Sequence, residues 1–157
     1  RMDAKMKFLL FIGLLFIGLF AEQVQITADS FDGDENALVA NLNGNVTIKN
    51  GKYDTLQANK AKILFDKNKK PIKYTASGNA RFKAELKGKR YDGSSDEISY
   101  EPASQIYILS GKAYLHEIDT DKKLYGNKIT INQKKGTYSV DGDGAPIKFI
   151  FDMQDKK

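Results

Sequence analysis

The stretch Tyr107-Ile-Leu-Ser-Gly-Lys-Ala-Tyr-Leu115 decides the fold, because its pattern recurs along the chain. Its odd-numbered residues are apolar or small and alternate with mostly polar neighbours, so one face of an extended strand is apolar. Aligned on the central glycine, the same spacing appears at 74–82 around Gly78 and at 40–48 around Gly44. A fourth copy at 138–142 loses its register between Gly144 and Pro146, which is typical of a terminal repeat.

A second element recurs between the glycine strands, at 56–65, 91–100 and 124–131, with a shorter first copy at 24–31. In the three full copies the inward positions step by two, jump by three after an alanine or glycine, and step by two again. A jump of three within a period of two indicates a β-bulge or corner, where an extra residue bends the strand. The pattern therefore predicts strands that fold across from one sheet to another.

The remaining pattern fits the same fold class. After residue 21 no stretch sustains a helical period, and short β-rich segments separated by turn-forming clusters recur roughly every fifteen residues. We expect one all-β domain over 22–157, built from repeated bent hairpins as a jelly roll, sandwich or stack.

Many expected interior positions hold small residues, which allows two interpretations. One is tight backbone approach at the corners, and the other is an apolar cleft that holds a ligand. The positions concerned are Ala28, Ala58, Ala76, Ala80, Gly93, Gly111, Ala113 and Gly126.

The first 21 residues have the layout of a signal peptide. Arg1 to Lys7 carries three basic residues and one acidic residue, and Phe8 to Phe20 is an uncharged apolar run. As a helix this run is about 20 Å long, whereas the bilayer core is about 30 Å thick, so a permanent anchor is the weaker interpretation. We expect cleavage after Ala21 and export to the periplasm.

Charge and cysteine content exclude some function classes. The formal charge is +5, of which residues 1–21 contribute +2, and the rest is spread along the chain without a basic cluster. A nucleic-acid partner is therefore not expected. The absence of cysteine is compatible with an exported protein whose core needs no disulfide.

No catalytic, metal or cofactor site is predicted. The chain lacks a cysteine nucleophile, and its single histidine, His116, follows Leu115 at an outward position, as a solvated surface residue does. The acidic runs at 29–35 and 141–144 fail the calcium-loop pattern, because the first has Ala40 where the loop needs glutamate and the second has Pro146 at the sixth position, where it needs glycine. Both runs are interpreted as turns.

Taken in order, several of these motifs resemble the LptA/OstA family of periplasmic lipopolysaccharide-transport proteins. The similar stretches are 93–101, 109–115, 126–130, the Gly-Asn pairs at 44–45 and 78–79, and the first strand from Val24 to Asp29. They cover nearly the whole chain after residue 21.

The resemblance implies a twisted antiparallel β-jelly roll, open along one side, whose interior holds the acyl chains of lipid A. It further implies a non-enzymatic bridge of jelly rolls joined head to tail. An LptC-like inner-membrane protein would bind the amino-terminal edge near 23–28, and an LptD-like outer-membrane protein the carboxy-terminal edge near 147–151. The Gly-Asp-Gly-Ala-Pro insertion in the last repeat is a departure from the family pattern.

Family lipid contacts carried over by alignment fall on Val24, Ile26, Phe82, Ile98 and Tyr100. The alternating interior pattern adds Val46, Ile48, Ile63, Leu109, Leu115 and Ile129. Two alternative functions are a structural β-repeat protein without a lipid ligand and a membrane-anchored, LptC-type member of the same system.

Overall fold

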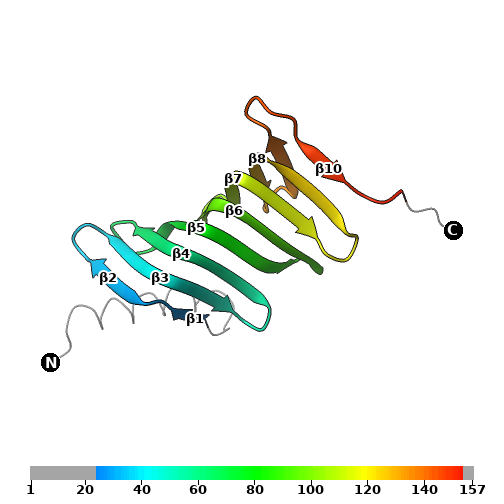
Figure 1. The fold of residues 1–157 in the computed structure, drawn as a ribbon. Helices are drawn as coiled ribbons and strands as arrows, with labels where there is room; N and C mark the ends of the chain where they lie inside the picture. The colour runs from blue at the N-terminus through cyan, green and yellow to red at the C-terminus, as the bar shows by residue number, and fades with distance from the viewer. Residues whose placement is uncertain (1–23, 154–157) are drawn as a thin grey trace.

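A computed structural model describes residues 24–153, which form one antiparallel sheet of ten strands. The sheet order is β1-β3-β4-β5-β6-β7-β8-β10, and β2 and β9 extend the edges by pairing with β3 and β8. Figure 1 shows that β1 and β2 lie at one end of an elongated molecule and β10 at the other. The strands are β1 (Val24–Thr27), β2 (Ser30–Asp34), β3 (Val39–Asn50), β4 (Asp54–Phe65), β5 (Pro71–Leu86), β6 (Lys89–Glu101), β7 (Ile106–Glu117), β8 (Lys122–Asn132), β9 (Thr137–Asp141) and β10 (Lys148–Ile150).

The predicted signal peptide, residues 1–21, lies outside the described residues. Within 24–153 no helix is long and apolar enough to cross a membrane. The all-β fold predicted from the repeats is confirmed.

The long strands bend near their middle, at the predicted corners, but the extra residue of each bulge lies in the glycine strands β3, β5 and β7 and not, as predicted, in β4, β6 and β8. In β3 the register shifts between Asn43 and Val46, where Gly44 and Asn45 oppose one residue of β4. These two residues have φ angles of 81° and 48°, a left-handed conformation that favours glycine and, next, asparagine. Equivalent shifts occur at 78–79 in β5 and at 111–112 in β7, so the corner recurs in every second strand.

A side chain from the neighbouring part of the sheet covers the glycine at each of these corners: from the link between β1 and β2, from β4 and from β6. A Cβ atom added to Gly44, Gly78 or Gly111 would lie less than 3.0 Å from the side chain of Asp29, Asn59 or Asp96, respectively. At the first corner the Asp29 backbone N–H also donates to the Gly44 carbonyl at 2.8 Å. The corners therefore exclude larger residues both by backbone conformation and by space.

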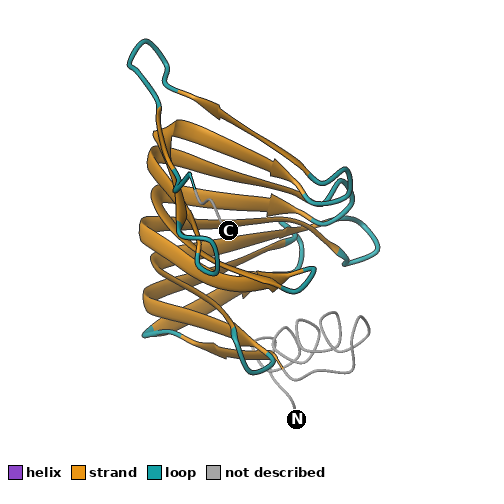
Figure 2. Cartoon of the chain, turned by 90° about the vertical axis from the view of Figure 1, so that its right-hand side faces the viewer, coloured by secondary structure: helices purple, strands orange, loops and turns teal. Residues whose placement is uncertain are grey.

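The bend divides the sheet into two arms that face each other. Arm I ends in the hairpin turns at 51–53, 87–88 and 118–121, and arm II in the turns at 35–38, 66–70, 102–105 and 133–136. Figure 2 shows the strands stacked along the length of the molecule, with the turns projecting at its sides. Tyr91 of arm I and Ile131 of arm II pack against the same cluster of buried side chains, which places the two arms opposite each other.

The interior is filled differently along the molecule. In the first half, two clusters of buried side chains pack between β1 and β5, one around Ile63 and Phe65 and one around Leu42 and Val46. In the second half a single cluster lies along the corner from β4 to β8. The fold therefore has a continuous apolar inner face from β1 to β9.

The terminal repeat differs from the others, as its sequence indicates. β9 and β10 pair with the two halves of β8, and residues 142–147 form a loop between them in place of a two-residue bulge. The last strand is thus split at its corner, as the first strand is split between β1 and β2.

Candidate functional site

An open cavity of about 430 Å³ lies between the two arms in the second half of the molecule. This volume is within the range of pockets that bind small molecules, roughly 300–1,000 Å³. All its lining residues come from β5 to β10 and the turns between them. The apolar and aromatic lining residues are Phe82, Ala84, Leu86, Tyr91, Tyr107, Leu115, Leu124, Ile131, Tyr138 and Phe149.

Strand alternation explains why these side chains face inward. On β5, Phe82, Ala84 and Leu86 are half-buried and line the cavity, whereas the intervening Arg81, Lys83 and Glu85 are exposed. The same period holds on the other long strands. The cavity is therefore the place where the apolar inner face remains uncovered between the arms.

A row of three tyrosines crosses arm II in direct register. Tyr74 pairs with Tyr100 and Tyr100 with Tyr107, with ring centroids 6.2 and 4.2 Å apart. The hydroxyl groups of Tyr100 and Tyr107 are hydrogen-bonded to each other. Burial raises the pKa of Tyr74 and Tyr107 far above the usual tyrosine value, and their neighbour Tyr100 adds to this. The row is therefore uncharged, and Tyr107 forms part of the cavity wall.

One edge of the cavity is polar. Lys87, Lys89 and Lys122 line it beside arm I, together with Glu117. Glu117 accepts a hydrogen bond from the Tyr91 hydroxyl at 3.4 Å and another from the Thr120 hydroxyl. The cavity thus combines apolar walls with a few polar groups near its opening.

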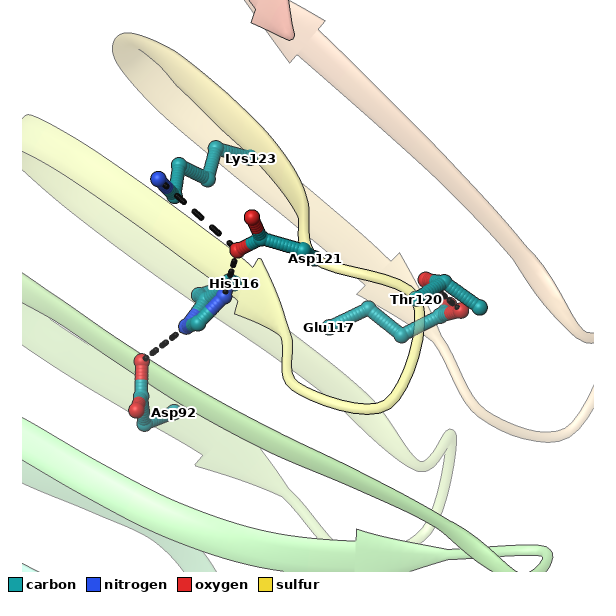
Figure 3. A network of polar contacts seen from close by, with 6 residues as sticks. All are labelled: Asp92, His116, Glu117, Thr120, Asp121 and Lys123. Atoms are coloured by element: carbon teal, nitrogen blue, oxygen red, sulfur yellow. Dashed lines mark hydrogen bonds and ion pairs between the residues drawn. The ribbon is translucent and has the colours of Figure 1, made fainter. Parts of the chain in front are cut away.

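The single histidine lies on the opposite, outer face of arm I (Figure 3). His116 Nε2 is 2.8 Å from Asp121 Oδ1, and its Nδ1 is 3.4 Å from Asp92 Oδ1. The predicted outward position is confirmed, although these contacts leave only 19% of the side chain exposed, less than expected of a solvated histidine. The cavity does not include His116.

The acidic runs were predicted to be turns, but Asp32 and Asp34 belong to β2 and Asp141 to β9, and the turns begin only after these strands end. Asp34 Oδ1 accepts the backbone N–H groups of Asn36 and Ala37, each at 2.9 Å, and Asp141 Oδ1 accepts that of Asp143 at 2.8 Å. These carboxylates therefore stabilise the local backbone.

Comparison with known proteins agrees with this geometry. Residues 25–137 match the family described as LptA/(LptD N-terminal domain) LPS transport protein. The chain belongs to this family. It is 26% identical over 144 residues to the lipopolysaccharide export system protein LptA of Escherichia coli K12, covering 86% of this chain and 75% of that protein. The LptA protein of Shigella flexneri matches to the same extent.

The family fold is also found among solved structures. The crystal structure of LptH, the LptA homologous periplasmic component of the lipopolysaccharide transport device of Pseudomonas aeruginosa, superposes with a TM-score of 0.71 at 18% identity. The match covers 84% of this chain and 96% of LptH. The twisted jelly-roll fold implied by the LptA/OstA resemblance is thereby confirmed.

The residues proposed from sequence lie at different depths in this LptA-type fold. Phe82 and Leu115 line the open cavity. Val46, Ile63, Ile98, Leu109 and Ile129 are buried in the core clusters, and Ile26, Ile48 and Tyr100 are half-buried on the inner face. Val24 is in β1, at the edge of the sheet. Their role as lipid contacts remains a prediction.

Eight apolar or aromatic cavity residues were not proposed as lipid contacts, although seven of them continue the same alternating patterns: Ala84, Leu86, Tyr91, Tyr107, Leu124, Ile131 and Tyr138. The eighth is Phe149 on β10. Most of these lie toward the hairpin turns, where the arms have diverged, whereas the buried residues lie nearer the corner, where the arms converge. The distance of a residue from the corner therefore separates cavity residues from buried ones, and the alternating pattern alone does not contain this distance.

The two interpretations of the small residues are also resolved in part. A Cβ atom at Gly93 would lie 2.6 Å from the Phe82 ring and 2.7 Å from the Tyr114 carbonyl oxygen, so this glycine marks tight packing. Ala80 and Ala113 are buried in the corner cluster. Tight approach is confirmed at these positions, and none of the eight small residues named from the sequence lines the cavity.

Proposed function

We propose that this protein is a periplasmic lipopolysaccharide-binding transport protein of the Lpt system, which shields lipid A acyl chains between its two arms. The observation that carries the proposal is the apolar cavity between arms I and II, in a chain of the LptA family. The relatives named above are lipopolysaccharide export and transport proteins, which supports the same ligand class.

Transfer free energies explain why such a protein is needed. Moving one methylene group out of water gains about 0.8 kcal/mol, so an acyl chain of about twelve carbons in water carries a penalty near 10 kcal/mol. An apolar inner face that runs along the sheet removes most of this penalty. It gives the lipid no direction, so one-way transport requires energy from a membrane partner.

The two ends of the sheet supply the proposed docking surfaces. β1 with β2 and β9 with β10 are edge strands, whose outer backbone groups are available to extend a sheet. The second edge also exposes Ile147, Phe149, Ile150 and Phe151. We place an LptC-like inner-membrane protein at the first edge, an LptD-like outer-membrane protein at the second, and head-to-tail copies of this chain between them.

Photo-crosslinking to lipopolysaccharide tests the ligand. A photoreactive amino acid at Phe82 or Leu115, which line the cavity, should crosslink the lipid, whereas one at Lys128, exposed on β8, should not. Equal crosslinking at all three positions, or none, would favour the structural β-repeat alternative.

A further inference from the structure

The polar edge of the cavity is built by the same alternation as its apolar wall. Lys89 precedes Tyr91 by two residues on β6, and Lys122 precedes Leu124 by two on β8, so both lysines are on the inner face of their strands. Lys87 joins them from the turn between β5 and β6, where it has a φ angle of 51° and is followed by Gly88 at 80°. The three side chains therefore meet the cavity opening from one side.

Spacing along the sheet keeps these lysines within reach of one ligand headgroup. Lys122 is in register with Glu117 of β7 and Tyr91 of β6, and Lys89 lies two residues further along β6, so the Cα atoms of Lys89 and Lys122 are about 12 Å apart. Lysine side chains are long and flexible, and both ammonium groups can approach an anion placed between them.

Nearby cations are paired, but these three are not. Arg90 is 3.2 Å from Asp119, and Lys123, which also lines the cavity, is 3.7 Å from Asp121. Among residues 24–153, no carboxylate lies within 4.0 Å of the ammonium groups of Lys87, Lys89 or Lys122. Glu117, the acidic residue in the lining, is already hydrogen-bonded to Tyr91 and Thr120. The opening thus has an excess of positive charge beside apolar walls.

We propose that this cavity is specific for a phosphate-bearing acyl lipid, bound with the phosphate at Lys87, Lys89 and Lys122 and the acyl chain against Phe82, Leu115 and Leu124. The inference rests on the proposed function and deepens it, because it assigns the headgroup chemistry and the orientation of the bound lipid. A phosphate monoester is dianionic near neutral pH and accepts from several ammonium groups at once.

The test compares three probes with the same twelve-carbon chain, used below their micelle concentrations: dodecyl phosphate, dodecyl maltoside and dodecyltrimethylammonium. Each competes with a fluorescent apolar probe for the purified protein. We expect dodecyl phosphate to bind about tenfold more tightly than the maltoside, and the cationic probe to bind most weakly. Raising the ionic strength from about 0.05 M to 0.5 M should remove most of the phosphate advantage, because screening is strong over these distances.

Charge reversal locates the headgroup. The Lys89→Glu/Lys122→Glu double variant should lose about tenfold in affinity for dodecyl phosphate and less than about twofold for the maltoside. Lys128→Glu, on the outer face of β8, is the matched control and should change both affinities by less than about twofold. If the double variant does not fold, Lys122→Gln replaces it, with a smaller loss of the same selectivity.

The outcomes separate this inference from the function it rests on. If the three probes compete equally, or if the double variant behaves like Lys128→Glu, the headgroup assignment is wrong while acyl binding stands. If none of the probes competes, the proposed lipid binding is itself wrong. A dodecyl phosphate preference that the Lys89→Glu/Lys122→Glu double variant removes and Lys128→Glu retains would establish the assignment. Substituting lipopolysaccharide and then a phosphatidic acid for dodecyl phosphate distinguishes the two sources of the phosphate group.

Discussion

The first and second halves of the molecule share one corner design but differ in what lies between their arms. From β1 to β4 two clusters of buried side chains lie between the arms, and Ile63 and Phe65 are almost completely buried against residues of β2, β3 and β5. From β5 to β10 the corner is equally tight, but the arms enclose an open cavity whose walls include Ala84 and Gly136. The difference teaches that the corner residues determine the bend, whereas residues toward the turns determine whether the interior is packed or hollow.

The largest expected effect comes from emptying the packed half. Phe65→Ala removes a buried ring, so we expect the free energy of unfolding to fall by about 3–5 kcal/mol. Phe82→Ala, at the wall of the open cavity, should cost less than half of that, because its ring is already partly exposed. Urea denaturation followed by circular dichroism measures both values. Equal losses would mean that the two halves are packed alike.

A charge placed in the hollow half should act on ligand binding more than on stability. Tyr138 lines the cavity and is 59% exposed, so Tyr138→Asp should leave the protein folded but weaken lipopolysaccharide binding about tenfold through an unpaired carboxylate beside the acyl chain. Ser139→Asp, one residue further and on the other face of β9, is the matched control. A similar loss in both variants would remove cavity contact as the explanation.

Alkaline pH tests the buried tyrosine row, which lies on β5, β6 and β7 at the start of the second half. Burial raises the pKa of Tyr107, so at pH above about 10 the unfolded chain loses this proton while the folded chain keeps it. The contribution of Tyr107 to the free energy of unfolding is fully present below the pKa that the tyrosine has in the unfolded chain. It is lost as the pH rises through the pKa of the folded protein. At pH 11 the loss reaches at most about 1.4 kcal/mol. Tyr107→Phe should therefore become relatively more stable between pH 8 and pH 11, and an unchanged difference between the two proteins would contradict this.

The smallest expected effect concerns the edges. Ile150→Pro removes a backbone donor from β10 and should shorten head-to-tail oligomers a few-fold without changing the packed half. Ile150 is preferable to Phe149, since Phe149 lines the cavity and its replacement would also affect ligand binding. Light scattering over a range of concentrations measures the length. Unchanged oligomers in the variant, or a monomer throughout for the wild type, would argue against association through this edge.

The two halves also differ in a feature that the sequence does not predict. The alternation from Tyr107 to Leu115 and the jump after Ala58 each reflect local backbone geometry, so the strands, the corners and the inner face could be predicted, but not which strand of each pair carries the extra residue. The depth of Leu109 relative to Tyr107 could not, because both face inward and only the distance between the arms separates a core residue from a cavity wall. The close contact of the Asp96 side chain with Gly111 could not be predicted either, because it joins two strands across a register shift.

Because a neighbouring side chain covers the glycine at each corner, the length of the apolar inner face does not depend on its cross-section. Each corner is completed by the strand next to it, as Asn59 completes the corner at Gly78, and needs nothing from strands further away. One more hairpin of the same kind would therefore extend the apolar inner face by two strand spacings, about 10 Å, and leave the existing corners unchanged. The distance that a single copy spans is thus set by how many times the hairpin is repeated, and evolution can change this number by duplication without redesigning the interior.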